Sequence, residues 1–598
     1  MPQPTSSDAR PPRPWADTVA VVSSGIAVSI FAGIIEAAIR RFGVPGIERL
    51  ADVGNAFFWI LPVGLALVNL PIVVVVAASH RLWPAAVTEA RAAMVSTLLP
   101  SVSVSLAVLT TRIAEPVHAI LALGIATMVG RAVAARPGGF RRLLRVAVPI
   151  LLVAPPVALA MVLVSRARAA RLTAAVPDRG APNVLLVVWD TVRRPSLSLY
   201  GHDRPTSPQL TKRAAGGVVF EAAYSTAPWT LPSHASMFTG LHMQDLSTTW
   251  TAPLDRSRVV VAEIFSRAGY RTAGITANLM ATHRPTGLAR GFQHYEDSRI
   301  GRRPREYIGQ LSLSQRLRRH QPFQRWSTFQ GTWKDAEEIS RSFLRWLAQS
   351  PPDRPFFAFL NYFDAHQPYR SPPEFRARFQ GRGVQDRYDA GIAYVDAELD
   401  RLLTELERQG LLANTIVVVT SDHGEEFGEH GFEGHGESLH AQVLSVPLVV
   451  IAPGRVPAGI RLPQVTSTRH VGPTLVALAG LDSTFGRLGG ESLARFWTDS
   501  ASARDTALAG AHEGVNQLAE TQISGGPATA IIDDRYHYIR TGRGREFLFG
   551  VADDPGQRHD LIGVDSLKPV IERTRRHLST RLGEAWIQGP GAPASRAP

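Results

Sequence analysis

The chain has 598 residues, of which 45% are hydrophobic and 19% charged, so it is too long for one small core and poorer in charge than an ordinary soluble enzyme. It has no cysteine, which excludes disulfides, thiolate metal sites and a cysteine nucleophile. The net charge of +13 comes mainly from arginine, and without a nucleic-acid-binding motif it favours a membrane surface or an anionic substrate over nucleic acid.

The first third of the chain predicts a membrane domain over residues 16–172. Residues 1–15, which precede it, are polar and rich in proline and serine, as is typical of disorder. Five apolar runs follow, and each is long enough to cross a bilayer about 30 Å thick. We place these runs near residues 17–39, 55–79, 92–111, 114–134 and 146–165.

Arginine counts in the short loops predict the orientation of these five segments. Five arginines lie at the end of the fourth segment and in the loop before the fifth, namely Arg131, Arg136, Arg141, Arg142 and Arg145, whereas Arg112 alone lies between the third and fourth. This distribution predicts a multi-pass protein, as in a bacterial inner membrane, with its N-terminus inside and everything after Arg171 outside the cytoplasm. Glu36 and Asn69 lie within predicted spans, where a packing role is favoured over a transport pathway.

Three later segments each predict a buried strand that ends in polar residues. They are 183–189 before Asp190, 356–363 before Asp364, and 415–421 before Asp422 and His423. Continuous apolar runs are typical of parallel strands buried on both faces. The carboxyl ends of such strands form the sites of open α/β sheets, so we expect these polar ends to converge on one face. Carboxylate oxygens and an imidazole suit one divalent cation, either Mn, Mg, Ca or Zn.

Three further segments complete the predicted organisation. Thr230 precedes a Pro in a loop that runs into a helix, whose N-terminal amides would attract an anion. Residues 301–335 are rich in arginine with interleaved aromatics, which is typical of a solvated basic insertion and also fits a rim that holds an anionic substrate or lipid headgroup. Helical spacing over 387–412 predicts a β–α–β alternation. The residues 586–598 indicate a disordered tail.

The order of these motifs over residues 181–565 resembles the sulfatase family of the alkaline phosphatase superfamily. The matching motifs are Asp190-Thr191 with Arg193, Thr230-x-Pro232-Ser233-His234, Asp364-x-His366, Ser421-Asp422-His423-Gly424 and the closing Glu546-Phe547-Leu548-Phe549. The resemblance implies that residues 181–585 form an α/β catalytic domain. Its central sheet would be mainly parallel and flanked by helices, with a small C-terminal α+β part, after the N-terminal α-helical transmembrane bundle.

The resemblance also implies roles for individual residues. The metal ligands would be Asp190, Asp422, His423 and the hydroxyl oxygen of Thr230. The catalytic residues would be Thr230 as the nucleophile, with His366, His435 and His234. The substrate-binding residues would be His366, His435, Arg193 and Asn278.

Thr230 departs from the family pattern, because family sulfatases convert a Cys or Ser at this position to formylglycine. Threonine cannot form that aldehyde, so an ester on Thr230 must be opened by water or another acceptor, which favours phosphate over sulfate esters. The chain is therefore predicted to be a membrane-anchored, metal-dependent hydrolase of sulfate or phosphate esters. Its partners would be membrane lipid and an anionic glycan or lipid headgroup.

Two alternatives remain open. The predicted architecture, with a threonine nucleophile, also resembles the phosphoethanolamine transferases and lipoteichoic acid synthases, which take a phospho-headgroup from a lipid donor. The alternative of another class is a catalytically silent, membrane-bound binding module, which need not hold a stoichiometric divalent cation.

Overall fold

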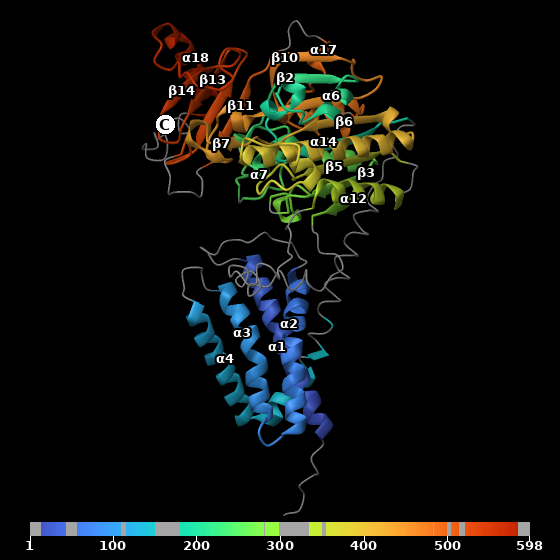
Figure 1. The fold of residues 1–598 in the computed structure, drawn as a ribbon, viewed down its shortest axis with the longest axis vertical. Helices are drawn as coiled ribbons and strands as arrows, with labels where there is room; N and C mark the ends of the chain where they lie inside the picture. The colour runs from blue at the N-terminus through green and yellow to red at the C-terminus, as the bar shows by residue number, and fades with distance from the viewer. Residues whose placement is uncertain are drawn as a thin grey trace, which may run out of the picture. The chain divides into compact units, whose positions relative to one another are not determined.

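The computed structural model falls into two compact units, one formed by helices before residue 168 and one by the described residues from 180 onward (Figure 1). Short gaps separate the segments within each unit. The described residues are 14–42, 57–108, 115–146, 148–149, 153, 180–250, 252–279, 281–297, 334–349, 354–481, 483–498, 504–512 and 521–583.

The first unit is a bundle of helices. Its members are α1 (Pro14–Phe42), α2 (Phe57–Leu82), α3 (Glu89–Val108) and α4 (Glu115–Ala135). These helices overlap the first four predicted spans, whereas the fifth, predicted over 146–165, lies almost wholly outside the described residues. Within the described part of the chain, Leu61–Leu82 and Pro116–Ala135 are long and apolar enough to cross a membrane. Length and composition alone carry that finding, so the multi-pass arrangement stays a prediction.

Buried polar side chains connect α1, α2 and α3. The Asn69 amide donates hydrogen bonds of 2.9 Å to both the Ser29 hydroxyl and the Ser96 carbonyl. The Ser103 hydroxyl donates a 2.7 Å hydrogen bond to the Glu36 carboxylate. Glu36 and Asn69 are both fully buried. Polar groups inside an apolar bundle need such partners, which agrees with a packing role for these two residues.

An eight-stranded mixed sheet forms the centre of the second unit, in the order β10-β2-β9-β6-β1-β5-β3-β4. Its strands are β1 (Asn183–Trp189), β2 (Val218–Tyr224), β3 (Arg271–Thr276), β4 (His294–Glu296), β5 (Phe356–Tyr362), β6 (Thr415–Thr420), β9 (Ser445–Ile451) and β10 (Ile460–Ser467). Strand β9 runs antiparallel to both its neighbours, whereas the other pairings are parallel. The sheet is therefore mixed, because no long crossover helix lies between β6 and β9 to return the chain in the parallel sense.

Helices cover both faces of this sheet, so its central strands are buried on both sides. Along β1, Leu185 and Val187 pack in the cluster that includes α12 and α14, while Leu186 and Val188 pack in the cluster that includes α7 and α8. The helices of the unit are α6 (Pro208–Ala214), α7 (Thr230–Thr239), α8 (Val261–Arg267), α12 (Ala336–Gln349), α13 (Pro373–Arg376), α14 (Val384–Arg408), α15 (Ala441–Leu444), α16 (Val471–Leu478), α17 (Arg495–Thr498) and α18 (Lys568–Leu582). The continuous apolar runs of the strands follow from this two-sided burial.

A second, antiparallel sheet carries the C-terminal part, drawn in orange and red in Figure 1. It consists of β11 (Ala507–Ala511), β12 (Ala528–Ile532), β13 (Tyr536–Arg540) and β14 (Glu546–Gly550), and a small hairpin elsewhere consists of β7 (Glu426–Phe427) and β8 (Glu433–Gly434). One face of this sheet packs on α18 through a cluster that includes Tyr538 and Leu578. This arrangement is a small α+β part beside the large sheet.

Candidate active site

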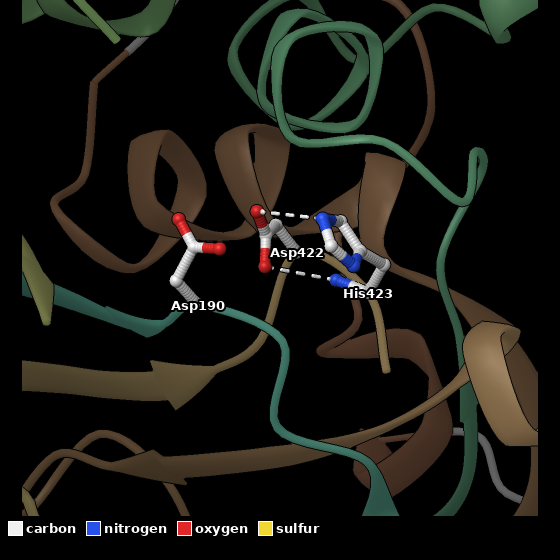
Figure 2. A group of neighbouring side chains, drawn as sticks. All are labelled: Asp190, Asp422 and His423. Carbon is white, nitrogen blue, oxygen red and sulfur yellow. Dashed lines mark hydrogen bonds and ion pairs between the residues drawn. The ribbon is translucent and has the colours of Figure 1, made fainter. Parts of the chain in front are cut away.

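Three adjacent parallel strands, β5, β1 and β6, deliver polar residues to one edge of the large sheet. In their register, Val188 lies opposite both Asn361 and Thr420, so Asp190 and Asp422 follow at neighbouring strand ends. Asp190, Asp422 and His423 each place one ligand atom within 4.8 Å of the others, and all three are buried. Figure 2 shows the Asp190 carboxylate beside the linked Asp422 and His423.

Among the residues that the structure describes, each of the two carboxylates has one oxygen atom without a hydrogen-bond partner. Asp190 Oδ2 accepts hydrogen bonds from the amides of Asn278, at 3.0 Å, and Asn361, at 3.2 Å, but Oδ1 accepts none. Asp422 Oδ2 likewise accepts none. Burial, and then the charge of Asp422, raise the pKa of Asp190 above its ordinary value. Two buried carboxylates with unpartnered oxygens are an arrangement that a divalent cation satisfies, so these residues fit the metal that the motifs imply.

His423 presents a ring nitrogen to the same place. Its Nδ1 lies 3.0 Å from the Gly424 carbonyl oxygen, which can only accept, so Nδ1 carries the proton and Nε2 keeps its lone pair. That Nε2 lies 3.5 Å from Asp422 Oδ2. Burial, and then the charge of His435, lower the pKa of His423 to about 3. A neutral imidazole with an available lone pair is the form that binds metal ions.

The Thr230 hydroxyl lies beside this cluster because Thr230 is the first residue of α7. Its Oγ1 is 3.2 Å from His423 Nε2 and accepts a 3.3 Å hydrogen bond from the Asn278 amide. One turn later, His234 Nδ1 donates a 2.8 Å hydrogen bond to the Thr230 carbonyl and lies 3.6 Å from Asp422 Oδ2. The helix thus places a nearly buried hydroxyl at the strand ends, and His234 holds its first turn.

The backbone around Asp422 is held by hydroxyl groups and by one unusual residue. The Ser233 and Ser225 hydroxyls both donate to the Asp422 carbonyl, Ser233 at 2.6 Å. Thr191 has a φ of 62°, which is rare for a β-branched residue, and its amide donates to Asp422 Oδ1 at 3.2 Å. The Tyr388 hydroxyl donates to the Thr191 carbonyl at 2.8 Å. Such strain persists where the surroundings impose it, often at functional sites.

Two further histidines lie next to His423. The ring of His435 is 4.4 Å from that of His423 and 5.1 Å from that of His366. His435 Nδ1 bonds to the buried Glu425 carboxylate at 2.9 Å, and Glu425 also accepts from the Tyr369 hydroxyl at 3.2 Å. Burial alone would lower the pKa of His435, but Glu425 outweighs it and the pKa is raised. Burial, and then His435, lower the pKa of His366.

Arg193 makes its contacts away from the two carboxylates. Its guanidinium donates to the Glu425 carbonyl at 3.0 Å and to the Glu429 carboxylate at 2.8 Å, and it lies 4.9 Å from the centre of the Phe427 ring. These contacts hold the segment that carries Glu425. In the structure Arg193 therefore positions the segment that carries Glu425. Asn278, predicted for the same substrate-binding role, contacts both Asp190 and Thr230.

Sequence reasoning missed four residues of the site: Asn361, Glu425, Ser225 and Ser233. Asn361 is a polar residue near the end of a largely apolar strand. Glu425 comes two residues after the candidate ligand His423. Both positions therefore carried a signal in the sequence. Ser225 carried none, because only the folded chain brings it to the Asp422 carbonyl, whereas Ser233 stands in the motif Thr230-x-Pro232-Ser233-His234 but had no role assigned to it. The arginine-rich segment predicted over 301–335 falls almost entirely outside the described residues.

Comparisons with known proteins agree with this geometry. A family model described as Sulfatase matches residues 182–481. The ulvan-active sulfatase of Formosa agariphila is 24% identical over 444 residues, which cover 67% of this chain and 80% of that protein. An arylsulfatase of Clostridium perfringens is 22% identical over 489 residues, which cover 67% of this chain and 94% of that protein. The phosphonate monoester hydrolase of Agrobacterium radiobacter shares the fold, with a TM-score of 0.54 and 20% identity over 68% of this chain and 96% of that one.

Proposed function

The chain belongs to the sulfatase family and is an ester hydrolase of that family, and from this premise we propose that it is a membrane-anchored phosphoesterase that uses Thr230 as its nucleophile. The observation that carries the proposal is the position of the Thr230 hydroxyl. It is buried, its oxygen lies 3.2 Å from His423 Nε2, and two carboxylates lie next to it. Sulfate and phosphate esters are both oxyanions that such a centre can bind. A threonine nucleophile favours the phosphate ester.

One divalent ion would be held by Asp190, Asp422 and His423, with Thr230 as the fourth ligand. When bound, the ion supplies positive charge that lowers the pKa of a neighbouring hydroxyl and offsets the charge on the ester oxygens. Asn278 orients two of these groups, since its amide bonds to both Asp190 and Thr230. Asn361 does the same for Asp190 from the next strand.

The reaction of a phosphate ester would begin with Thr230. Its oxygen forms a bond to phosphorus while the bond from phosphorus to the leaving oxygen breaks. The hydroxyl proton can pass to solvent, because His423 Nδ1 already carries the ring proton and the lone pair of Nε2 would face the ion. Water then opens the Thr230 ester, which releases phosphate and restores the hydroxyl.

The leaving oxygen needs a proton, and His435 is the residue best placed to hold one. Its bond to Glu425 favours the protonated imidazole, and its ring lies 4.4 Å from that of His423. His366, whose pKa is lowered, would contact the ester in its neutral form. His435 would thus act as the general acid or as the cation that holds the transferred group.

Thr230 supports a phosphate ester over a sulfate ester. An aldehyde at this position would expel sulfate and regenerate itself, but threonine cannot be converted to that aldehyde. An ester on threonine must instead be hydrolysed by water. This step is workable for a phosphate ester, but it makes the release of sulfate slow. The chain shares its fold with a phosphonate monoester hydrolase and is related to sulfatases, so this fold supports both chemistries.

A second candidate function is transfer of a phospho-headgroup from a lipid to another acceptor. The observation that favours it is the pair of long apolar helical segments, Leu61–Leu82 and Pro116–Ala135, in the same chain as the candidate site. The same Thr230 ester would form, but an acceptor hydroxyl would replace water in the second step. This candidate predicts little turnover of soluble esters and a requirement for lipid.

The test compares an aryl sulfate, an aryl phosphate monoester and an aryl phosphodiester with the detergent-solubilised full chain, with and without chelator. Thr230→Ala is the decisive variant, and Thr239→Ala is its matched control, since both residues are buried threonines of α7. We expect phosphoester hydrolysis that chelator abolishes, a loss of at least a thousandfold in Thr230→Ala, on the order of removing a catalytic nucleophile, and near-normal activity in Thr239→Ala.

Each contrary result has its own meaning. Sulfate as the best substrate would overturn the phosphate preference while keeping the nucleophile. Equal activity in Thr230→Ala and the wild type would overturn the nucleophile. Turnover that appears only when lipid donors are supplied would replace hydrolysis by headgroup transfer.

A further inference from the structure

A cavity rich in basic side chains lies at the far end of α7 from Thr230. Its volume is about 320 Å³, enough for roughly ten water molecules at about 30 Å³ each. It is lined by His242, Arg469, Arg504, Asp505, Thr506, Leu508, Ile531, His577 and Arg581. These residues come from the loop after α7, from η8 (Thr468–His470), from residues 504–506 and the adjoining β11, from β12 and from α18. We call this space the basic cavity.

The basic cavity is separate from the candidate active site. Arg469 donates a 3.1 Å hydrogen bond to the carbonyl of Gly240, the residue that follows the last turn of α7. Thr230 lies at the opposite end of this helix, and ten helical residues span about 15 Å. An anion held at Arg469 would therefore not touch the Thr230 hydroxyl.

The acidic residues around the basic cavity already have partners. Asp505 is already bonded to His470, at 2.9 Å, and paired with Arg495, at 3.3 Å. Arg581 pairs with Asp245 at 2.5 Å, and Arg504 lies 4.0 Å from Asp534.

Arg469 is the lining arginine whose charge has no such partner. Among the described residues, no carboxylate lies within 4.0 Å of it. Arg469 forms the half-buried floor of the cavity, while Arg504 and Arg581 stand at its exposed rim.

Two buried nitrogen atoms of the cavity floor also have no partner among the described residues. Arg469 Nε and His242 Nδ1 make no hydrogen bond within the described part of the chain. Burial, followed by the charges of Arg469 and Arg581, lowers the pKa of His242 to about 4, so this imidazole is neutral. A buried guanidinium donor without a partner is costly, and an oxyanion would satisfy it.

We infer that the basic cavity is a second oxyanion site, which takes a tetrahedral sulfate or phosphate group at Arg469 with Arg581 and Arg504 at its rim. The inference goes beyond the proposed reaction and does not depend on it, because the site lies at the other end of α7. The group could arrive as the free product ion or attached to a sugar, and the shared chemistry is that of the oxyanion.

Equilibrium dialysis with labelled inorganic phosphate and sulfate tests the site on the detergent-solubilised full chain. Thr230→Ala protein treated with chelator serves as the background, so that binding does not report catalysis. We expect one equivalent of phosphate per chain, weakened at least tenfold by Arg469→Gln. Arg581→Gln should weaken it severalfold and, as an exposed residue of α18, gives a second variant that does not disturb the core.

Arg455→Gln is the matched control, since Arg455 is an exposed arginine that also bonds only to a backbone carbonyl, at 3.4 Å. Unchanged binding in this control, with loss in the two cavity variants, supports the site. Absence of binding in the background, equal binding in all variants, or equal loss in the control would overturn it. Parallel measurements with glucose 6-phosphate and glucose 6-sulfate distinguish an attached group, which binds as tightly as the ion, from the free ion alone.

Discussion

Asp422 has two oxygen atoms in different situations, and this difference predicts how the site responds to a metal. Oδ1 accepts hydrogen bonds from the backbone amides of Thr191, at 3.2 Å, and His423, at 2.9 Å, whereas Oδ2 accepts none. In Asp422→Asn the carbonyl oxygen can take the place of Oδ1 and the amide nitrogen that of Oδ2. The substitution therefore removes one charge beside Asp190 without disturbing the backbone contacts.

We expect Asp422→Asn to lose the bound divalent cation, from about one per chain to near zero by elemental analysis after dialysis. In chelator the variant should unfold at a higher temperature than the wild type, because one of two buried neighbouring carboxylates is gone. In excess cation the order should reverse, since binding at a hundred times Kd stabilises the wild type by about 2.7 kcal/mol. Asp364→Asn, at the end of β5 but outside the cluster, should keep its metal; equal metal content in both variants would contradict the ligand assignment.

Asn278 is the residue that links Thr230 to the carboxylates. Asn278→Ala removes the donors to Asp190 Oδ2, at 3.0 Å, and to Thr230 Oγ1, at 3.3 Å. We expect kcat/KM for the best ester to fall by about a hundredfold, the order of losing one oriented donor. The matched control is Asn414→Ala, an exposed asparagine that donates to a backbone carbonyl at 3.2 Å before β6. A similar loss in both variants would show that Asn278 acts only through stability.

At the scale of elements, a buried network of histidine and glutamine joins the C-terminal sheet to the segment after the candidate ligands. The Gln557 side chain accepts from His440 Nδ1 at 2.9 Å and donates to His537 Nδ1 at 2.6 Å. The Gln522 amide donates to His440 Nε2 at 2.8 Å. A nitrogen that accepts a hydrogen bond carries no proton, so both imidazoles are neutral in the folded chain. His430 stacks on His440 at 3.8 Å, which makes it structural as well.

This network predicts a loss of stability in mild acid. Burial, and then the charge of His440, lower the pKa of His537 to about 3. The unfolded value is about 6.5, so the unfolded chain binds more protons between those limits and stability falls as the pH drops. The free energy of unfolding should fall between pH 7 and pH 5 in both proteins. We expect this fall to be about 2 kcal/mol smaller in His537→Gln than in the wild type.

Urea denaturation at pH 7 and pH 5 measures this difference. His559→Gln is the control, because His559 is exposed and outside the network. The same pH dependence in the wild type and in His537→Gln would show that His537 is not held neutral by the fold.

At the scale of the whole molecule, the absence of cysteine makes the predicted membrane orientation directly testable. Gly139→Cys and His559→Cys each introduce one thiol at an exposed position, the first between the fourth and fifth predicted spans and the second in the C-terminal part. With the N-terminus inside, an impermeant maleimide should label residue 559 in intact cells, and residue 139 only after lysis.

Both variants should also stay with the membrane in alkaline carbonate, since the predicted spans cross the bilayer. Labelling of residue 139 alone in intact cells would invert the orientation. Release of the protein by carbonate would remove the membrane anchor from the proposed function.

The amino-acid sequence by itself determined the strand ends, the ligand types and the family. Asp190, Asp422 and His423 were predictable because each follows a continuous apolar strand, and parallel strands end at one edge of a sheet. Helices α1 to α4 of the first unit were predictable from runs of apolar residues, whose length is a property of the sequence alone.

The tertiary structure alone decided the remaining contacts of the site. These contacts join residues far apart in the chain, and nothing in the sequence indicates which distant residues will meet. The Ser225 and Ser233 hydroxyls donate to the Asp422 carbonyl across separations of 197 and 189 residues in the chain. Arg193, predicted to bind substrate, pairs with Glu429 once the chain folds. The antiparallel β9 and the basic cavity are likewise products of packing, since pairing direction and converging charge depend on which surfaces the fold brings together.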